Sequence, residues 1–331
     1  MRVLVTGPAG FLGGEIVNQL ISRGDDVVGI SRGDYPGLAD RGVDYHRGDL
    51  ADADVARQLI RDVDAVVHTA AVAGVWGPYE SFYRINTLAT LNVIDACRQN
   101  DIRTLVFTSS PSVTFCGDHQ RGINESAPYP QRWLCAYPQT KALAEQAVLD
   151  AHGKDGINTC SLRPHLIWGE NDPHLLARVV DRAKSGKLKI VGDAKNLIDT
   201  VHVTNAAAAH LDAIDALSQQ PHIAGGRAYF IAQDEPVNCW DWIVKICEIA
   251  GVPAPSRKVP FPAAYGIGAA LETLYRATGR QSEPPMTRFV AAQLAKDHYF
   301  DISAAKERLG YTVRVSMAQG LDQLRAAWKD R

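Results

Sequence analysis

Two hydrophobic patterns of different period alternate through the first half of the chain. Short β-branched runs stand at residues 3–5, 27–30, 65–67, 105–107 and 159–162. Between them, apolar residues recur every three or four positions at residues 11–22, 52–61, 88–99 and 140–151. Short β-branched runs are typical of strands, and the longer period is typical of amphipathic helices. Their alternation predicts βαβ units and a parallel sheet covered on both faces.

Because such crossovers are right-handed, the pattern predicts an α/β fold with a doubly wound parallel sheet, the Rossmann topology. After residue 164 the alternation loosens and prolines and glycines punctuate the chain, although residues 200–203 and 229–231 still resemble strands. We expect a smaller, mostly helical lobe, interleaved with the sheet. The predicted division assigns residues 1–164 and 194–232 to the Rossmann domain and residues 165–193 and 233–331 to a substrate-binding lobe.

Composition indicates a soluble globular protein, with 46% hydrophobic and 22% charged residues among 331. The 35 basic and 37 acidic side chains leave a formal charge of −2, which creates no field favouring nucleic acid or an anionic membrane. The expected partners are therefore small molecules or proteins.

Six cysteines form neither a C-x-x-C pair nor a cluster with metal-ligand spacing. We expect reduced thiols, no metal and a cytoplasmic location, since the N-terminus also lacks the features of a signal peptide. An apolar run at residues 261–275 is too short and too interrupted to span a bilayer. It is compatible with a buried helix, the wall of an apolar pocket or a peripheral membrane contact.

Three glycines follow the first predicted strand and open the first predicted helix. A turn of this kind lets the backbone approach a pyrophosphate, which the helix N-terminus attracts with amide donors and its dipole. The alternative is a tight turn without a ligand. Its position in the first βα turn favours a dinucleotide cofactor. The predicted contacts are Gly7, Gly10, Phe11, Leu12 and Gly13.

The end of the second strand bears on the choice of cofactor. NAD-binding domains usually carry an acidic residue there, whereas this strand ends in Ser31-Arg32. A guanidinium is suited to a 2′-phosphate, and Ser31 adds a hydroxyl donor. The sequence therefore favours NADP(H). In the alternative, Arg32 is merely solvated and Asp34 takes the acidic role.

A third segment, Gly48-Asp49-Leu50, follows a short predicted strand at residues 44–46. Asp49 and Leu50 are candidates to hold the adenine edge. Asp49 is also a candidate cap for the helix that begins near Asp52. The two interpretations are compatible.

Tyr137 and Lys141 stand four residues apart at the start of a predicted helix, with Pro138 suited to its first turn. A phenol with a pKa near 10 is a poor acid or base at neutral pH, but a neighbouring cation favours its ionised form. The pair follows a strand that ends in Ser109 and Ser110, at the sheet edge where ligands bind. A chance Tyr-x-x-x-Lys at an exposed helix start is the alternative.

Taken together, these motifs resemble those of the extended short-chain dehydrogenase/reductases, in particular the 3β-hydroxysteroid dehydrogenase/isomerase-like branch. The similarity spans nearly the whole chain. The matching features are Thr6-Gly7-x-x-Gly10-Phe11-Leu12-Gly13, Gly48-Asp49-Leu50, His68-Thr69-Ala70-Ala71, Asn86, Thr108-Ser109-Ser110, Tyr137-x-x-x-Lys141, Arg163-Pro164 and Val201-His202-Val203.

The resemblance implies a role for each of these residues. Tyr137 exchanges a proton with the substrate oxygen, Lys141 binds the nicotinamide ribose, and Ser110 orients the carbonyl, with Ser109 and Ser112 as alternatives. Asn86 supports the active-site water or backbone. The remaining implied cofactor contacts are Ala70, Ala71, Thr108 and Pro164, and the candidate substrate contacts are Trp76, Ser112 and His165.

Softer signals at residues 111–114, 166–169 and 283–289 resemble the bacterial 2-alkyl-3-oxoalkanoate reductases of long-chain olefin biosynthesis. The implied activity is reduction of a lipid-like 3-keto acid to a 3-hydroxy acid. A 3β-hydroxysteroid or sterol-4-carboxylate 3-dehydrogenase is the alternative, and a non-catalytic NADP sensor is the alternative of another class. We expect a homodimer, with a multienzyme contact left open.

Overall fold

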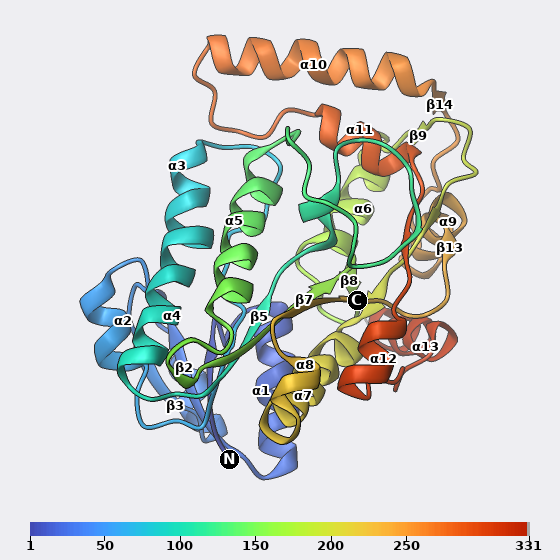
Figure 1. Ribbon diagram of the computed structural model, residues 1–331. Helices are drawn as coiled ribbons and strands as arrows, with labels where there is room; N and C mark the ends of the chain where they lie inside the picture. Colours follow the sequence, from blue (N-terminus) through green and yellow to red (C-terminus); the bar gives the residue numbers. More distant parts are fainter. Residues whose placement is uncertain (330–331) are drawn as a thin grey trace.

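The computed structural model describes residues 1–329 and contains a central seven-stranded parallel sheet (Figure 1). The strand order is β12-β7-β5-β4-β1-β2-β3. The strands are β1 (Arg2–Thr6), β2 (Asp26–Ser31), β3 (Asp44–Arg47), β4 (Ala65–His68), β5 (Thr104–Thr108), β7 (Asn158–Pro164) and β12 (Arg227–Ile231). The chain winds outward from β1 to β3 and then returns to β4 on the other side of β1. This reversal creates a topological switch point at the carboxyl ends of β1 and β4.

Helices cover both faces of this sheet, which confirms the doubly wound architecture. Alternate residues of each strand point to opposite faces, so Val3 and Val5 pack in one hydrophobic cluster while Leu4 packs in the other. The first cluster contains α1 (Phe11–Arg23), α7 (Val203–Gln219) and α12 (Ser303–Leu309). The second contains α2 (Ala53–Leu59), α4 (Ala89–Gln99) and α5 (Ala136–Ala151).

A third hydrophobic cluster lies outside the sheet, and we call the helices that surround it the outer lobe. These helices are α6 (Leu175–Lys184), α9 (Cys239–Ile249), α10 (Phe261–Ala277), α11 (Arg288–Ala295) and α13 (Met317–Trp328). Trp240 and Trp242 of α9 are buried against Trp168 and Leu176. The aromatic residues of α9 are therefore part of a core.

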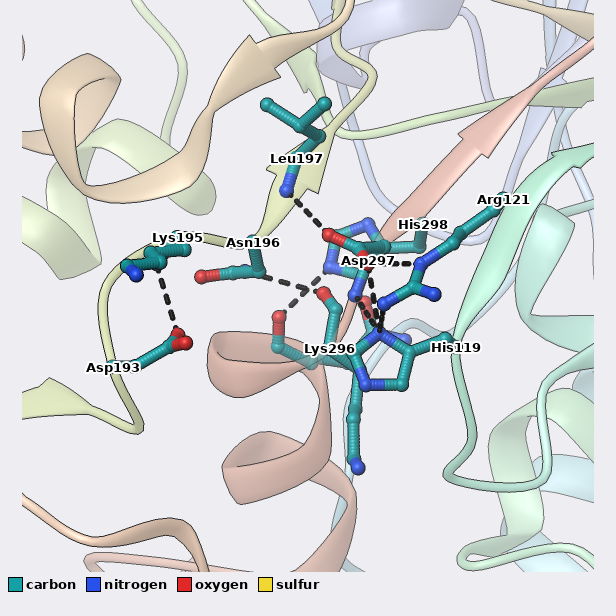
Figure 2. Close-up of polar contacts among 10 residues, drawn as sticks. His119, Arg121, Asp193, Lys195, Asn196, Leu197, Lys296, Asp297 and His298 are labelled. Carbon is teal, nitrogen blue, oxygen red and sulfur yellow. Dashed lines mark hydrogen bonds and ion pairs between the residues drawn. The ribbon is translucent and has the colours of Figure 1, made fainter.

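A small four-stranded sheet, β13-β10-β15-β6, connects segments that are distant in sequence. Asp297 immediately precedes an inner strand of this sheet. Its carboxylate accepts hydrogen bonds from the Leu197 amide (2.8 Å) and the Arg121 guanidinium (2.5 Å) and lies 2.8 Å from His119 Nδ1 (Figure 2). The strands of this small sheet are β6 (Gln120–Ile123), β10 (Leu197–Ile198), β13 (Val237–Asn238) and β15 (His298–Phe300). They come from both predicted parts of the chain, and the division into those parts stays a prediction.

The segment at residues 200–203 differs from its expected form. Only Val201–His202 is a strand, β11, and it pairs with β8 (Ile167–Trp168) rather than with the central sheet. Val203 already begins α7, whose second residue Thr204 donates its amide to the His202 ring. Other short elements are α3 (Tyr79–Phe82), α8 (Pro221–Ala224), β9 (Ile190–Val191), β14 (Lys258–Val259) and a π-helical turn at Tyr83–Leu88. Short 3₁₀ helices lie at Pro36–Arg41, Pro111–Thr114 and Lys154–Gly156.

The apolar run at residues 261–275 forms most of α10, which lies at the edge of the molecule (Figure 1). Ala264 and Gly268 face inward, whereas Ile267 and Leu274 are about half exposed. No helix within residues 1–329 has the length and apolarity needed to cross a membrane.

Candidate active site

A cavity of about 620 Å³ opens at the switch point, along the carboxyl ends of β1, β2, β4 and β5. We call it the cleft. The residues predicted to contact a cofactor all line it, and Ser110 lines it too. They are Gly7, Gly10, Phe11, Leu12, Gly13, Ser31, Arg32, Asp49, Leu50, Ala70, Ala71, Thr108, Tyr137, Lys141 and Pro164. Tertiary folding therefore gathers segments from the first 164 residues into one concave surface.

The glycine turn forms one wall of the cleft. Gly7 has a φ of +70°, a conformation that favours glycine, and its amide donates to the Ile30 carbonyl (2.8 Å). A Cβ at position 13 would lie 2.1 Å from the Gly7 carbonyl oxygen, so Gly13 lets α1 pack closely against the turn. Gly10 is the N-cap of α1 and has no side chain with which to bond its first amides. The positive end of α1 therefore faces the cleft, ready for an anionic group.

The rim beside β2 carries Ser31 and an exposed Arg32. The Ser31 hydroxyl lies 2.8 Å from the Tyr45 hydroxyl, which donates to the Gly33 carbonyl (2.5 Å). Asp34 is exposed and is not among the residues that line the cleft. The basic residue and the neighbouring hydroxyl, rather than the acidic residue, therefore stand at this rim.

Asp49 occupies the next position along the rim. Its carboxylate accepts from the Arg84 guanidinium (2.8 Å) and the Ala51 amide (3.1 Å). Burial acts to raise the pKa of Asp49, but these two donors outweigh it and hold the pKa below its usual value. The interpretation of Asp49 as the cap of α2 is wrong, because Asp52 is the N-cap and accepts from the first-turn amides.

Tyr137 and Lys141 project from the first turns of α5, which begins at Ala136. The Lys141 ammonium is almost completely buried, donates to the Thr108 carbonyl (2.5 Å) and lies 4.1 Å from the centre of the Phe107 ring. Burial lowers the pKa of Lys141 to about 7, and the negative charge of Glu145 opposes this shift. The lysine is thus anchored to the end of β5, beside the tyrosine.

The hydroxyl groups near Tyr137 differ in their access to the cleft. Burial raises the pKa of Tyr137, and a hydrogen bond with Ser110 opposes that shift. The Ser110 hydroxyl also lies 2.8 Å from the Ser112 hydroxyl. Ser109 and Ser110 line the cleft and Ser112 does not. Ser110 is therefore the serine that both reaches the tyrosine and faces the cavity, with Ser112 behind it.

A buried ion pair between Arg163 and Glu145 supports α5 one turn beyond Lys141. Arg163 donates to Glu145 (2.6 Å), which also accepts from the Tyr129 (2.7 Å) and Ser161 (2.8 Å) hydroxyls. Burial acts to raise the pKa of Glu145, but Arg163 outweighs it and the carboxylate stays ionised. Arg163-Pro164 was recognised as a motif, but its acidic partner lies 18 residues earlier.

Asn86 does not line the cleft but braces its wall. It lies in the π-helical turn, where its side chain accepts from the Val72 amide (2.8 Å) and donates to the Val72 carbonyl (3.1 Å) and the Thr140 hydroxyl (3.2 Å). These bonds tie the loop after β4 to α5. Asn86 thus supports backbone, one of the two roles that the family resemblance implies.

Two candidate substrate contacts lie away from the cleft. Trp76 lines a neighbouring cavity of about 240 Å³, where its indole donates to the Arg280 carbonyl (3.2 Å) and stacks against the Arg276 guanidinium. His165 is buried beneath the cleft, with Nε2 2.7 Å from His298 Nδ1. Cleft residues that the sequence did not single out include Tyr35, Ile85, Asp172 and His174. They come from loops and edges without a recognisable motif.

A doubly wound sheet, a glycine turn at its switch point and a buried lysine beside a tyrosine are typical of short-chain dehydrogenase/reductases. The model of the 3-beta hydroxysteroid dehydrogenase/isomerase family matches residues 4–262. The chain belongs to this family and is a short-chain-dehydrogenase-type oxidoreductase that depends on a nicotinamide dinucleotide.

Similar proteins agree with this assignment. The chain is 46% identical to a 2-alkyl-3-oxoalkanoate reductase of Shewanella oneidensis, over 98% of this chain and 86% of that protein. It is 41% identical to a protein of the same name from Stenotrophomonas maltophilia, over 99% of each chain. A decarboxylating sterol-4-alpha-carboxylate 3-dehydrogenase of Mus musculus is 33% identical, over 97% of this chain and 89% of that protein.

Solved structures share the fold across the full length. A UDP-glucuronic acid 4-epimerase from Bacillus cereus, solved in complex with NAD, superposes with a TM-score of 0.74 over 99% of this chain and 100% of that one. The sequence identity is 21%, so this likeness concerns the fold.

Proposed function

We propose that this protein interconverts a 3-keto acid and a 3-hydroxy acid with NADP(H), and that its substrate is a 2-alkyl-3-oxoalkanoate. The observation that carries the proposal is the presence of Tyr137, Lys141 and Ser110 in the same cleft as the glycine turn. The two bacterial relatives named 2-alkyl-3-oxoalkanoate reductase support the substrate class. The resemblance noted in the sequence supports a role of this reaction in long-chain olefin biosynthesis.

In this proposal the cofactor, when bound, supplies or accepts the hydride. Tyr137 donates a proton to the substrate carbonyl oxygen during reduction and removes it during oxidation. Ser110 donates a hydrogen bond to the same oxygen and so fixes the position of the carbonyl. The raised pKa of Tyr137 keeps the phenol protonated, as the reductive direction requires. Lys141 binds the ribose and, when charged, stabilises the phenolate needed for oxidation.

The preference for NADP(H) is supported by the rim of the cleft. Arg32 can place a charged, planar group of donors against a 2′-phosphate, and Ser31 adds a hydroxyl beside it. An acidic residue at this point would repel that phosphate, but Asp34 is not part of the lining.

A second candidate is oxidation of a 3β-hydroxysteroid or a sterol-4-carboxylate by the same residues. The Mus musculus relative, similar along nearly the full chain, favours it. A cofactor sensor without catalysis is disfavoured because the proton-transferring Tyr137 and its lysine are both present in the cleft.

The test is a substrate panel assayed with the full chain and NADP⁺, followed by the absorbance of the reduced nicotinamide. The oxidative direction is preferable because 3-keto acids decarboxylate spontaneously. The panel contains 2-alkyl-3-hydroxyalkanoic acids of graded chain length, a 3-hydroxy acid without the 2-alkyl group, and a 3β-hydroxysteroid.

We expect kcat/KM to rise with chain length, because each buried methylene contributes about 0.8 kcal/mol, and to be far higher for the branched acids than for the steroid. Turnover of the steroid with no activity on the hydroxy acids at any length would replace this proposal with the sterol function.

A further inference from the structure

A cavity of about 890 Å³ lies in the outer lobe, between α6, residues 185–191, β14 and α10. We call it the α6/α10 cavity. It has no lining residue in common with the cleft, although Tyr275 lines both it and the Trp76 cavity. Figure 1 shows α10 at the edge of the molecule, with α11 and α6 on its inner side. This cavity is therefore separate from the proposed cofactor site.

The lining of the α6/α10 cavity is amphipathic. One part is apolar and belongs to the outer-lobe core or borders it; its residues include Val191, Val259, Ala264, Met286 and Leu294. The other part carries five cationic side chains, Arg178, Arg182, Lys187, Lys189 and Arg257. Only two acidic side chains, Asp181 and Glu283, are among the lining residues. The cavity thus combines an apolar floor with an excess of positive charge.

One carboxylate in this cavity is already bound by a guanidinium. Arg178 donates to both oxygens of Glu283 at 3.0 Å, so the two groups meet fork to fork. Arg182 lies one turn further along α6, and a spacing of four residues puts it on the same helix face. Its side chain makes no hydrogen bond or ion pair with any residue in the part of the chain that the structure describes. Arg182 therefore lacks a bidentate carboxylate partner of the kind that Arg178 has in Glu283.

The environment of Arg182 favours the binding of an anionic ligand. Its side chain is half-buried, and burial together with the nearby Arg178 charge lowers the pKa of its guanidinium, while the negative charge of Glu283 opposes this shift. Because both Glu283 oxygens are already bound by Arg178, the partly desolvated Arg182 has no carboxylate of its own, and an incoming anion would offset part of its desolvation cost. A carboxylate matches the planar fork, and an attached alkyl chain can leave water by lying on the apolar floor.

We propose that the α6/α10 cavity is a second ligand site that binds a long-chain fatty carboxylate, with the head group on Arg182 and the chain along the apolar floor beneath α10. This site goes beyond the proposed catalytic function and does not depend on it. Arg178 remains paired with Glu283 and helps to set the positive field.

The probe is dodecanoate, titrated calorimetrically below its micelle concentration into the full chain saturated with NADP⁺. Arg182→Glu is compared with Lys184→Glu, which makes the same charge change on the same helix at an exposed side chain outside the cavity. Arg182→Lys tests whether the fork geometry matters. Circular dichroism and thermal unfolding check that each variant is folded.

We expect Arg182→Glu to weaken dodecanoate binding roughly 10- to 100-fold, the range for a hydrogen bond to a charged group, and Lys184→Glu to change it less than about twofold. Arg182→Lys should fall between Arg182→Glu and the unmodified chain. Dodecanol should bind more weakly than dodecanoate, and binding should tighten with chain length.

Several results would overturn the proposal. If the Arg182→Glu variant and the unmodified chain bound dodecanoate equally well, Arg182 would not contact the head group. If the Arg182→Glu and Lys184→Glu variants lost affinity equally, the attraction would be a nonspecific charge effect. Much tighter binding of dodecyl phosphate would reassign the site to phosphate. Loss of binding in Ser110→Ala but not in Arg182→Glu would place dodecanoate in the cleft. Normal turnover of Tyr137→Phe, or inactivity of the chain on every hydroxy acid, would contradict the proposed function without changing dodecanoate binding, so the two proposals can fail separately.

Discussion

The helix starts that face the cleft differ from those in the outer lobe. Gly10 precedes α1 and Cys135 precedes α5, and neither provides a side-chain cap. In the outer lobe, α9, α11 and α13 are capped by Asn238, Thr287 and Ser316, whose side chains accept from first-turn amides. Three outer-lobe helices thus have a side-chain cap, whereas α1 and α5 at the cleft have none. In the outer lobe, α10 is an exception, because Pro260 precedes it without capping it.

We interpret this difference as a loss of helix stability at the cleft that leaves backbone amides available to a ligand. A side-chain cap typically contributes about 1 kcal/mol, and an uncapped helix start leaves amide donors for a ligand. The start of α6 is an intermediate case, because the Asp172 carboxylate accepts from the amides of residues 174–176 while Asp172 itself lines the cleft. We therefore interpret the absence of a cap at α1 as part of the proposed cofactor site.

The largest expected effect is on catalysis in the cleft. Tyr137→Phe should lower turnover by about 10²- to 10⁴-fold, the usual contribution of a general acid, because it removes the transferable proton and keeps the ring. NADPH affinity, measured by fluorescence titration, should be retained. Tyr83→Phe is the control, since Tyr83 is exposed and does not line the cleft. Normal turnover of Tyr137→Phe would exclude this tyrosine from the mechanism.

The next largest effect is expected on cofactor affinity, at the rim of the cleft beside β2. Arg32→Ala should weaken NADPH binding by roughly 1.5–3 kcal/mol, the value of a charge-assisted hydrogen bond, and leave NADH nearly unaffected. Titration of both cofactors measures the difference. An exposed arginine outside the cleft, Arg61, supplies the control substitution Arg61→Ala. An equal loss with NADPH and NADH would contradict a 2′-phosphate contact.

A smaller effect should follow from giving α1 the cap that it lacks. Gly10→Asp places a carboxylate at the helix start, where it competes with the pyrophosphate, so cofactor affinity should fall by about 1–2 kcal/mol while thermal stability holds or rises. A Cβ here would lie 3.3 Å from the Gly7 carbonyl oxygen, so Gly10→Ala controls for crowding. If Gly10→Ala weakened binding as much as Gly10→Asp, the effect would be steric.

The smallest effect is expected from the reverse change, the removal of a helix cap in the outer lobe. Ser316 and Gln319 form a capping box at the start of α13, so Ser316→Ala should lower the free energy of unfolding by about 1 kcal/mol. Denaturant unfolding measures this change, and cofactor affinity should stay constant. A changed affinity would mean that the outer-lobe caps and the cleft are coupled, which would break the comparison.

Much of the central fold was predictable because its signals are local. Strand and helix periods located β1, β2, β4, β5, β7 and the helices between them, since each pattern reflects neighbours within a few residues. The glycine turn and the Tyr137–Lys141 pair were also predictable, because a positive φ that favours glycine at position 7 and a four-residue helical spacing are both properties of short segments.

Tertiary structure alone decided which of the adjacent side chains face a cavity. His165 follows the Arg163-Pro164 motif directly, but its ring contacts His298, 133 residues later, and does not line the cleft. Ser110 faces the cleft while Ser112 lies behind it, and Arg182 lines a cavity closed by α10, far along the chain. Sequence periods report which face of an element is apolar; the partner on that face is set by long-range packing, which no local pattern encodes.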